Sequence, residues 1–212
     1  YNINNADITS TSYYTGGIFG YSYYNYYNQY NENRGDVTSG GLYTGGINGY
    51  NYGSNYYCRY NLNSGNVSST SYHVGGINGY ANYTYTDYCV NVGRVSSTYS
   101  GNAYVGGITG YATSSSAYTR YCLNAGKVSG YTYVGGIAGE GYYGNYISYC
   151  LNVGDVEGTV TGYTAAIAGY AYSGAPVDCY WDKQMCPTEY QYNAVAAPTY
   201  AKYTRELIGQ NT

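Results

Sequence analysis

Few side chains in this sequence are of the types that carry out acid–base, nucleophilic or metal chemistry. The chain has one histidine, His73, and 11 Asp and Glu residues among 212. Asp178, Asp182 and Glu189 lie close together and are of the types that form a hydrolase acid pair or a calcium site. The acids do not recur in register, however, and no Gly-x-Ser-x-Gly or phosphate-binding glycine loop occurs. We therefore expect a protein that is not an enzyme, with no catalytic residue, no cofactor and no metal ion.

Four of the six cysteines occur once per repeat of the sequence: Cys89, Cys122, Cys150 and Cys179, separated by 33, 28 and 29 residues. Metal-binding cysteines usually come in close pairs such as Cys-x-x-Cys. Two states remain open for this column, namely buried thiols and disulfides between neighbours. We favour thiols, because side chains stacked in parallel hold their Cβ atoms too far apart for a disulfide. Cys58 and Cys186 lie outside the column, and Cys58 could reach Cys89 while Cys186 could staple the end at Cys179.

The segments that carry these residues form an internal repeat. A Gly-Gly-Ile element recurs with steps of 29, 30, 31, 29 and 30 residues, and its last copy is Ala165-Ala166-Ile167. A second element, such as "CLNAGKV" at 122–128, precedes each copy and carries its shared residues at alternate positions. A period of two is typical of a strand with one selected face.

Two columns of equivalent residues follow from the repeat. The predicted core column consists of Ile18, Ile47, Ile77, Ile108, Ile137 and Ile167. The predicted asparagine ladder consists of Asn4, Asn33, Asn63, Asn91, Asn124 and Asn152. Asparagine amides stacked in this way can hydrogen-bond along the column, which avoids the cost of burying unpaired polar groups. His73 occupies a column that is tyrosine in the other repeats, so we expect it to be structural.

The repeat predicts an all-β fold, a single-stranded β-solenoid of about six coils with about 30 residues each. A propeller blade needs about 40–50 residues, which is more than this period provides. We expect the solenoid to span residues 1–183. Residues 184–212 leave the repeat and predict a short irregular or helical tail that caps or docks.

The motifs "[YH]-[VT]-G-G-I-x-G" and "[CN]-x-N-x-G-x-V" resemble those of the GLUG-motif repeat family of bacterial and archaeal surface proteins. The similarity covers about residues 1–183, and "CYWDKQ" at 179–184 and "YTRELIG" at 203–209 are similar to the way such arrays close. The resemblance implies a repeat fold in adhesin-like surface proteins and no agreed activity. The 39 tyrosines of this chain depart from the family pattern.

The composition favours an extracellular or cell-surface location. Only 9% of the residues are charged, the net charge is −3, and Tyr, Asn, Ser, Thr and Gly must cover the surface. A basic footprint for nucleic acid is absent, and no apolar run is long enough for a membrane span.

The first coil begins in mid-repeat, and its residues form the predicted assembly surface: Tyr1, Asn2, Ile3 and Asn4. An uncapped solenoid end invites pairing with another chain. We therefore expect a self-assembling fibre or filament subunit of a microbial surface, a homopolymer with head-to-tail stacking and tyrosine-rich contact faces. The alternative is an adhesin or carbohydrate-binding segment of a larger surface protein, with glycans or cell-surface polysaccharide as partner.

Overall fold

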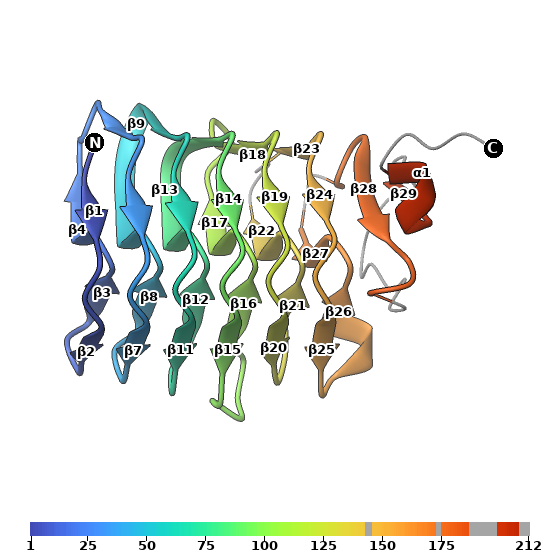
Figure 1. The fold of residues 1–212 in the computed structure, drawn as a ribbon, viewed down its shortest axis with the longest axis horizontal. Helices are drawn as coiled ribbons and strands as arrows, with labels where there is room; N and C mark the ends of the chain where they lie inside the picture. The colour runs from blue at the N-terminus through green and yellow to red at the C-terminus, as the bar shows by residue number, and fades with distance from the viewer. Residues whose placement is uncertain (143–145, 173–174, 187–198, 208–212) are drawn as a thin grey trace.

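Each repeat folds into one coil of short strands, because inward and outward side chains alternate along it and bends separate the strands. The computed structural model describes residues 1–142, 146–172, 175–186 and 199–207. Six coils stack along the long axis of the molecule, with the N-terminus at one end and the tail at the other (Figure 1). The expected all-β solenoid is confirmed.

The coils build four parallel sheets, which we call sheets A to D. Sheet A contains β1 (Ile3–Asn4), β6 (Glu32–Asn33), β10 (Leu62–Asn63), β14 (Val90–Asn91), β19 (Leu123–Asn124), β24 (Leu151–Asn152), β28 (Cys179–Asp182) and β29 (Thr199–Lys202). Sheet B contains β2 (Ile8–Ser10), β7 (Val37–Ser39), β11 (Val67–Ser69), β15 (Val95–Ser97), β20 (Val128–Gly130) and β25 (Val156–Gly158). Sheet C contains β3 (Tyr14–Gly16), β8 (Tyr43–Gly45), β12 (His73–Gly75), β16 (Tyr104–Gly106), β21 (Val134–Gly135) and β26 (Thr164–Ala165).

Sheet D is the longest of the four in the strand direction. It contains β4 (Phe19–Tyr23), β5 (Asn28–Gln29), β9 (Asn48–Arg59), β13 (Asn78–Asp87), β17 (Thr109–Thr113), β18 (Tyr118–Arg120), β22 (Ala138–Tyr142), β23 (Tyr146–Ser148) and β27 (Ala168–Ala171). Coils one to six comprise residues 1–30, 31–60, 61–88, 89–121, 122–149 and 150–178. A 3-10 turn, η1 (Thr161–Tyr163), and a short helix, α1 (Thr204–Leu207), complete the described elements.

Equivalent residues of successive coils lie directly beside one another. In sheet A, for example, Asn33 pairs with Asn63 and Asn63 pairs with Asn91. The interior is filled by columns of aliphatic side chains. Ile47, Ile77, Ile108, Ile137 and Ile167 are fully buried, as are the valines that begin the sheet B strands from β7 to β20.

The second glycine of each Gly-Gly pair lies against the next coil. A Cβ atom on Gly107 would lie 2.1 Å from the carbonyl oxygen of Gly136 and 2.3 Å from Cγ of Asn124. No real Cβ atom approaches that closely, so the column requires a residue without a side chain. The pair Ala165-Ala166 is tolerated in coil six because β26 is the last strand of sheet C among the described residues.

The two ends of the solenoid differ. Sheet A continues beyond coil six through β28 and β29, so the tail contributes a strand to the solenoid, and α1 follows β29 (Figure 1). Trp181 and Cys186 are buried there against the core. The described part of the chain contains no helix long and apolar enough to cross a membrane.

A methyl group in the glycine column is expected to disrupt stacking. We expect Gly107→Ala to lower the free energy of unfolding by about 3 kcal/mol, because backbone atoms and a hydrogen-bonded amide would have to move. Gly162→Ala is the matched control, since a Cβ there meets nothing within 4 Å. Urea unfolding followed by circular dichroism measures both, and equal midpoints would contradict the steric explanation.

Candidate functional site

The structure joins the six asparagines of the sequence-derived ladder into one chain of hydrogen bonds. Each Nδ2 donates to Oδ1 of the next asparagine at 2.8 Å, from Asn4 through to Asn152. Nδ2 of Asn91 also donates to the carbonyl oxygen of Gly93, as its equivalents do in their own coils. All but Asn4 are fully buried. The ladder is therefore a structural element with its hydrogen-bonding groups engaged.

The cysteine column is a run of buried free thiols. None of the six cysteines forms a disulfide, and each is 2% exposed or less. Cys89, Cys122, Cys150 and Cys179 lie in one column, and Cys58 lies beside it on β9 of sheet D, where its thiol interacts with that of Cys89. The disulfides considered for Cys58 and Cys186 are not present in the structure. Burial raises the pKa of Cys122 well above its ordinary value, which keeps this thiol neutral.

The acids that the sequence suggested for a catalytic pair have structural roles where the structure describes them. Asp182 is buried, and its carboxylate accepts hydrogen bonds from the Gln184 N–H and the Thr204 hydroxyl. Asp178 takes the corner position before Cys179, with a φ of 51°. Glu189 lies outside the described residues. No group of three or more metal-binding side chains forms in the part of the chain that the structure describes.

Two interlocked aromatic ladders run along the junction of sheets C and D. The first ladder consists of Tyr14, Tyr43, His73, Tyr104 and Tyr133, stacked at centroid distances of 4.8–5.4 Å. The second consists of Tyr21, Tyr50, Tyr80 and Tyr111, stacked at 4.7–5.3 Å. Rings of the two ladders meet edge to face, as Tyr43 and Tyr80 do at 5.3 Å. The two tyrosines that flank each Gly-Gly-Ile element are thereby brought together.

His73 fills a tyrosine position in the first ladder. Its ring stacks between Tyr43 at 4.9 Å and Tyr104 at 5.1 Å. Its Nδ1 is buried and has no hydrogen-bond partner among the described residues. Burial lowers the pKa of His73 to about 4, so the ring is neutral at physiological pH. The histidine is held as an aromatic spacer and is not placed for proton transfer.

Glu140 is an acid in the second ladder, which sequence reasoning missed. It lies between Tyr111 and Tyr170 in the register of sheet D and is only 5% exposed. Burial raises the pKa of Glu140 to about 7. The sequence signal was present, because "AGEGY" at 138–142 aligns with "TGYAT" at 109–113 and places an acid where the other coils have tyrosine.

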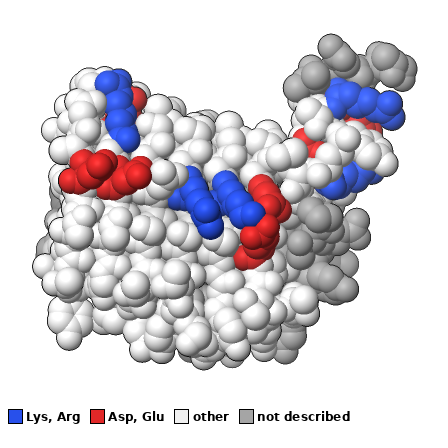
Figure 2. Space-filling view, turned by 60° about the horizontal axis from the view of Figure 1, so that its bottom comes forward, with Lys and Arg blue, Asp and Glu red and all other residues white. Residues whose placement is uncertain are grey.

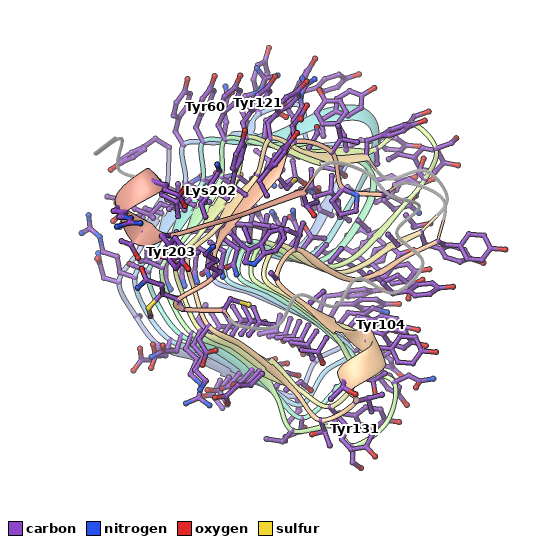
Figure 3. The ribbon with its side chains drawn as sticks, turned by 90° about the vertical axis from the view of Figure 1, so that its right-hand side faces the viewer. Tyr60, Tyr104, Tyr121, Tyr131, Lys202 and Tyr203 are labelled. Carbon is purple, nitrogen blue, oxygen red and sulfur yellow. The ribbon has the colours of Figure 1, made fainter. Side chains whose placement is uncertain are left out.

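A third aromatic column lines the corner between sheets D and A, and we call it the tyrosine ridge. It consists of Tyr30, Tyr60, Tyr88, Tyr121 and Tyr149, stacked at 5.0–5.1 Å with interplanar angles of 7–12°. Figure 3 shows Tyr60 and Tyr121 pointing outward at this corner. All five residues have a φ of 52–59°, in the left-handed region.

The backbone of the tyrosine ridge is strained. A left-handed conformation costs a bulky residue of the order of 1 kcal/mol more than it costs glycine. Five tyrosines nevertheless occupy positions where glycine or asparagine would be easier, so the rings themselves have a role. Sequence reasoning missed this column, although a tyrosine directly precedes Asn31, Asn61, Cys89, Cys122 and Cys150.

Three hollows lie on the described part of the surface. One is lined by serines, threonines and tyrosines between Ser97 and Thr159, a second lies around Tyr13 and Gly41, and a third lies between Gln184 and Arg205. None of these three contains a histidine, a cysteine or a carboxylate. The arrangement can pack aromatic rings and expose hydroxyl groups.

The neutral His73 makes stability fall in acid. The unfolded chain has an ordinary histidine pKa near 6.5, so it binds more protons than the folded chain below that pH. We expect the contribution of His73 to the free energy of unfolding to decrease by about 2 kcal/mol as the pH falls from about 6.5 to 4, while Glu140 contributes in the opposite sense over part of this range. His73→Tyr should remove this dependence, which urea unfolding at both pH values measures. An unchanged pH slope in His73→Tyr would show that the ring is not buried as described.

The buried Glu140 makes stability depend on pH in the opposite direction. Its folded pKa of about 7 exceeds the unfolded value near 4.3, so the folded chain binds more protons in between. Raising the pH from about 4.5 to 7.5 should therefore remove about 2–3 kcal/mol of stabilisation by Glu140, which in the wild type offsets the gain from His73. Glu140→Gln should abolish this loss, so that its stability rises with pH. Glu157→Gln, at an exposed position, is the control. Equal pH slopes for Glu140→Gln and wild type would contradict the prediction.

Comparisons with known proteins support the fold only. A scan against protein-family models finds no match, and a search of curated proteins finds none either. Among solved structures, the chain is similar to that of a "putative immunoglobulin A1 protease from Bacteroides ovatus", with a TM-score of 0.58 and 19% sequence identity. The match covers 93% of this chain and 68% of that chain. At this identity the similarity shows a shared β-solenoid fold and nothing of activity, and the GLUG resemblance stays a prediction.

Proposed function

We propose that the protein is a non-enzymatic structural protein of a microbial cell surface that assembles with copies of itself. The first coil supplies one contact and the tyrosine-rich sides supply others. The low charge and the polar, tyrosine-rich surface support an extracellular location.

The observation that carries this proposal is the open first coil. Within the described residues, nothing pairs with the outer edges of β1, β2, β3 or β4. Ile18 is only half-buried, whereas the five isoleucines stacked behind it are fully buried. Open strand edges beside an uncovered apolar column are the features that pair with another β-element.

The open edge also presents backbone donors. The N–H of Glu32 donates to the carbonyl oxygen of Asn2, on the side of the preceding coil. Ile3 is the equivalent of Glu32, so its N–H points away from coil two and outward. The residues Tyr1 to Asn4 thus lie at the end that another chain would meet.

The C-terminal end of the solenoid limits how one copy can join the next head to tail. The methyl groups of Ala165 and Ala166 occupy space that a following coil would need in sheet C. Sheet A, in contrast, extends two strands further, and the outer edge of β29 is unpaired among the described residues. We therefore expect β1 of one copy to meet β29 of another, so that sheet A continues across the contact.

The ladders favour assembly over carbohydrate stacking. A sugar ring stacks on one free face of an aromatic ring. In the interior of the tyrosine ridge, both faces of each ring are covered by neighbours at 5.0–5.1 Å. Solvent meets ring edges and hydroxyl groups there, which suit hydrogen bonding to a protein partner. Binding of glycans by an adhesin-like segment remains the alternative and would have to use these edges.

The open edge can be blocked by one substitution. We expect Ile3→Pro to reduce end-to-end association at least tenfold, because proline removes the outward N–H but leaves the carbonyl groups that β6 uses. Ile3→Thr keeps the N–H and is the control. Sedimentation velocity and negative-stain microscopy at high concentration measure the particles. Dispersed single solenoids in the wild type would contradict the proposal, as would equal assembly of Ile3→Pro and wild type.

A further inference from the structure

The outward side of sheet A carries a partly exposed strip of aliphatic residues. Inward asparagines alternate there with outward side chains in two adjacent columns. The first column is Glu32, Leu62, Val90, Leu123 and Leu151, and the second is Arg34, Ser64, Val92, Ala125 and Val153. In coils four to six both columns are aliphatic, and Val92 is 47% exposed. The tail strands and α1 lie beyond coil six along the axis (Figure 1).

Two different ridges border this strip. The tyrosine ridge runs along one side. The other side carries a charged column of Asp36, Asn66, Arg94, Lys127 and Asp155. Figure 2 shows acidic and basic side chains in separate groups along one band of the surface. An apolar centre with an aromatic and a charged rim has the composition of a protein interface.

We infer that two copies of this chain pack face to face through the outward side of sheet A, side by side, around a two-fold axis parallel to the solenoid axis. This inference deepens the proposed assembly but uses a side of the solenoid, not its ends. A two-fold axis in this direction keeps each coil level with the same coil of the second copy. It also reverses the order of the columns, so each column meets a different one.

The column reversal pairs complementary groups at the centre of the face. In coil two, Glu32 meets Arg34 of the second copy, and the pair occurs twice. Within one chain these residues already form an ion pair, with Nε of Arg34 2.6 Å from Oε1 of Glu32. Two copies would join the two pairs into one alternating network. In coils four to six, the aliphatic residues of one column meet those of the other, as Val90 does with Val92.

The rims are complementary as well. The tyrosine ridge of one copy meets the charged column of the other, coil by coil. Arg94 would lie against the outer edge of Tyr88, and Lys127 against that of Tyr121, where each cation can donate a hydrogen bond to the tyrosine hydroxyl oxygen. Arg94 has no ion pair within the described residues, whereas Lys127 already contacts Asp155 at 3.1 Å. A requirement for the rings at this contact also accounts for strained tyrosines where glycine would be easier.

The opposite, antiparallel arrangement is less favourable. It would place each column on itself with the coils in reverse order. Matching the aliphatic residues of coils three to six would then set Arg94 against Lys127. The other registers bring like charges together or press Glu32 and Arg34 onto aliphatic side chains. Buried unpaired charges and like-charge contacts both destabilise an interface, so the parallel arrangement is favoured.

The area of this face suffices for a moderate dimer. From the tyrosine ridge to the charged column the strand advances six residues, or about 20 Å, and six coils span about 29 Å. Each copy would therefore bury roughly 600 Å², and the pair about 1,200 Å², the lower limit for specific interfaces. We expect a dimer with a dissociation constant in the micromolar range.

Charge exchange tests the pairing in coil two. In the end-blocked Ile3→Pro background, sedimentation equilibrium should find a dimer. Val92→Glu and Arg34→Glu should each weaken it at least tenfold, and adding Glu32→Arg to Arg34→Glu should restore it. Thr38→Glu, exposed on sheet B in the same coil, is the control and should change nothing. Circular dichroism verifies that each variant is folded.

A distance measurement distinguishes the parallel from the antiparallel orientation of the dimer. Spin labels on Asn5→Cys should lie about 12 Å apart in the parallel dimer and more than about 30 Å apart in the antiparallel register that matches the aliphatic strips. The native thiols are buried and do not compete for the label. A chain that stays monomeric at about 0.2 mM, well above a micromolar dissociation constant, would overturn the inference. A long label distance, or no rescue by the charge exchange, would overturn it too. A dimer that persists with Ile3→Pro is independent of the end contact, so either proposal can fail alone.

Discussion

The fit between each buried asparagine and the coils around it determines the rest of the structure. Each amide in the interior of the ladder uses its two donors and its carbonyl oxygen, so only one register between coils leaves no buried polar group unpaired. The second glycine of the preceding coil lies against that amide, and a methyl group would occupy the same space. The asparagine hydrogen bonds and the lack of a side chain on the glycine therefore act as one constraint, which sets the register between coils. The isoleucine, valine and cysteine columns follow from that register.

A fixed register turns every outward position into a column with a repeat of one coil. Tyrosine gains most from this, because rings at such a spacing cover each other without leaving the surface. Burial raises the pKa of Tyr50 and Tyr104 to about 12, so these rings carry no charge at physiological pH. The chain thereby covers itself with neutral rings and hydroxyl groups. Its few charges lie in short groups, which makes their positions informative about contacts.

The fold could be predicted from the sequence because its determinants recur in it. Five Gly-Gly-Ile copies and six asparagines, each repeating every 28–33 residues, allow few architectures other than a solenoid, and that prediction is confirmed. The tyrosine ridge and the aliphatic strip were not predicted, although both are periodic. Their recognition requires the direction of each side chain around the coil, and a left-handed corner residue breaks the alternation on which that reading depends. The sequence placed Cys58 within reach of Cys89, and the structure brings the two together across a corner between sheets without a disulfide.

Two methyl groups, those of Ala165 and Ala166, bear on how such an array changes length in evolution. An internal duplication of whole coils anywhere before coil six preserves every column, because each inserted coil presents a glycine to its successor. A duplication after coil six would place the alanines in the interior, where the added methyl groups would break the stack. Coils can thus be added before coil six, whereas the addition of coils after it is restricted. A change of these two alanines to glycine would lift that restriction.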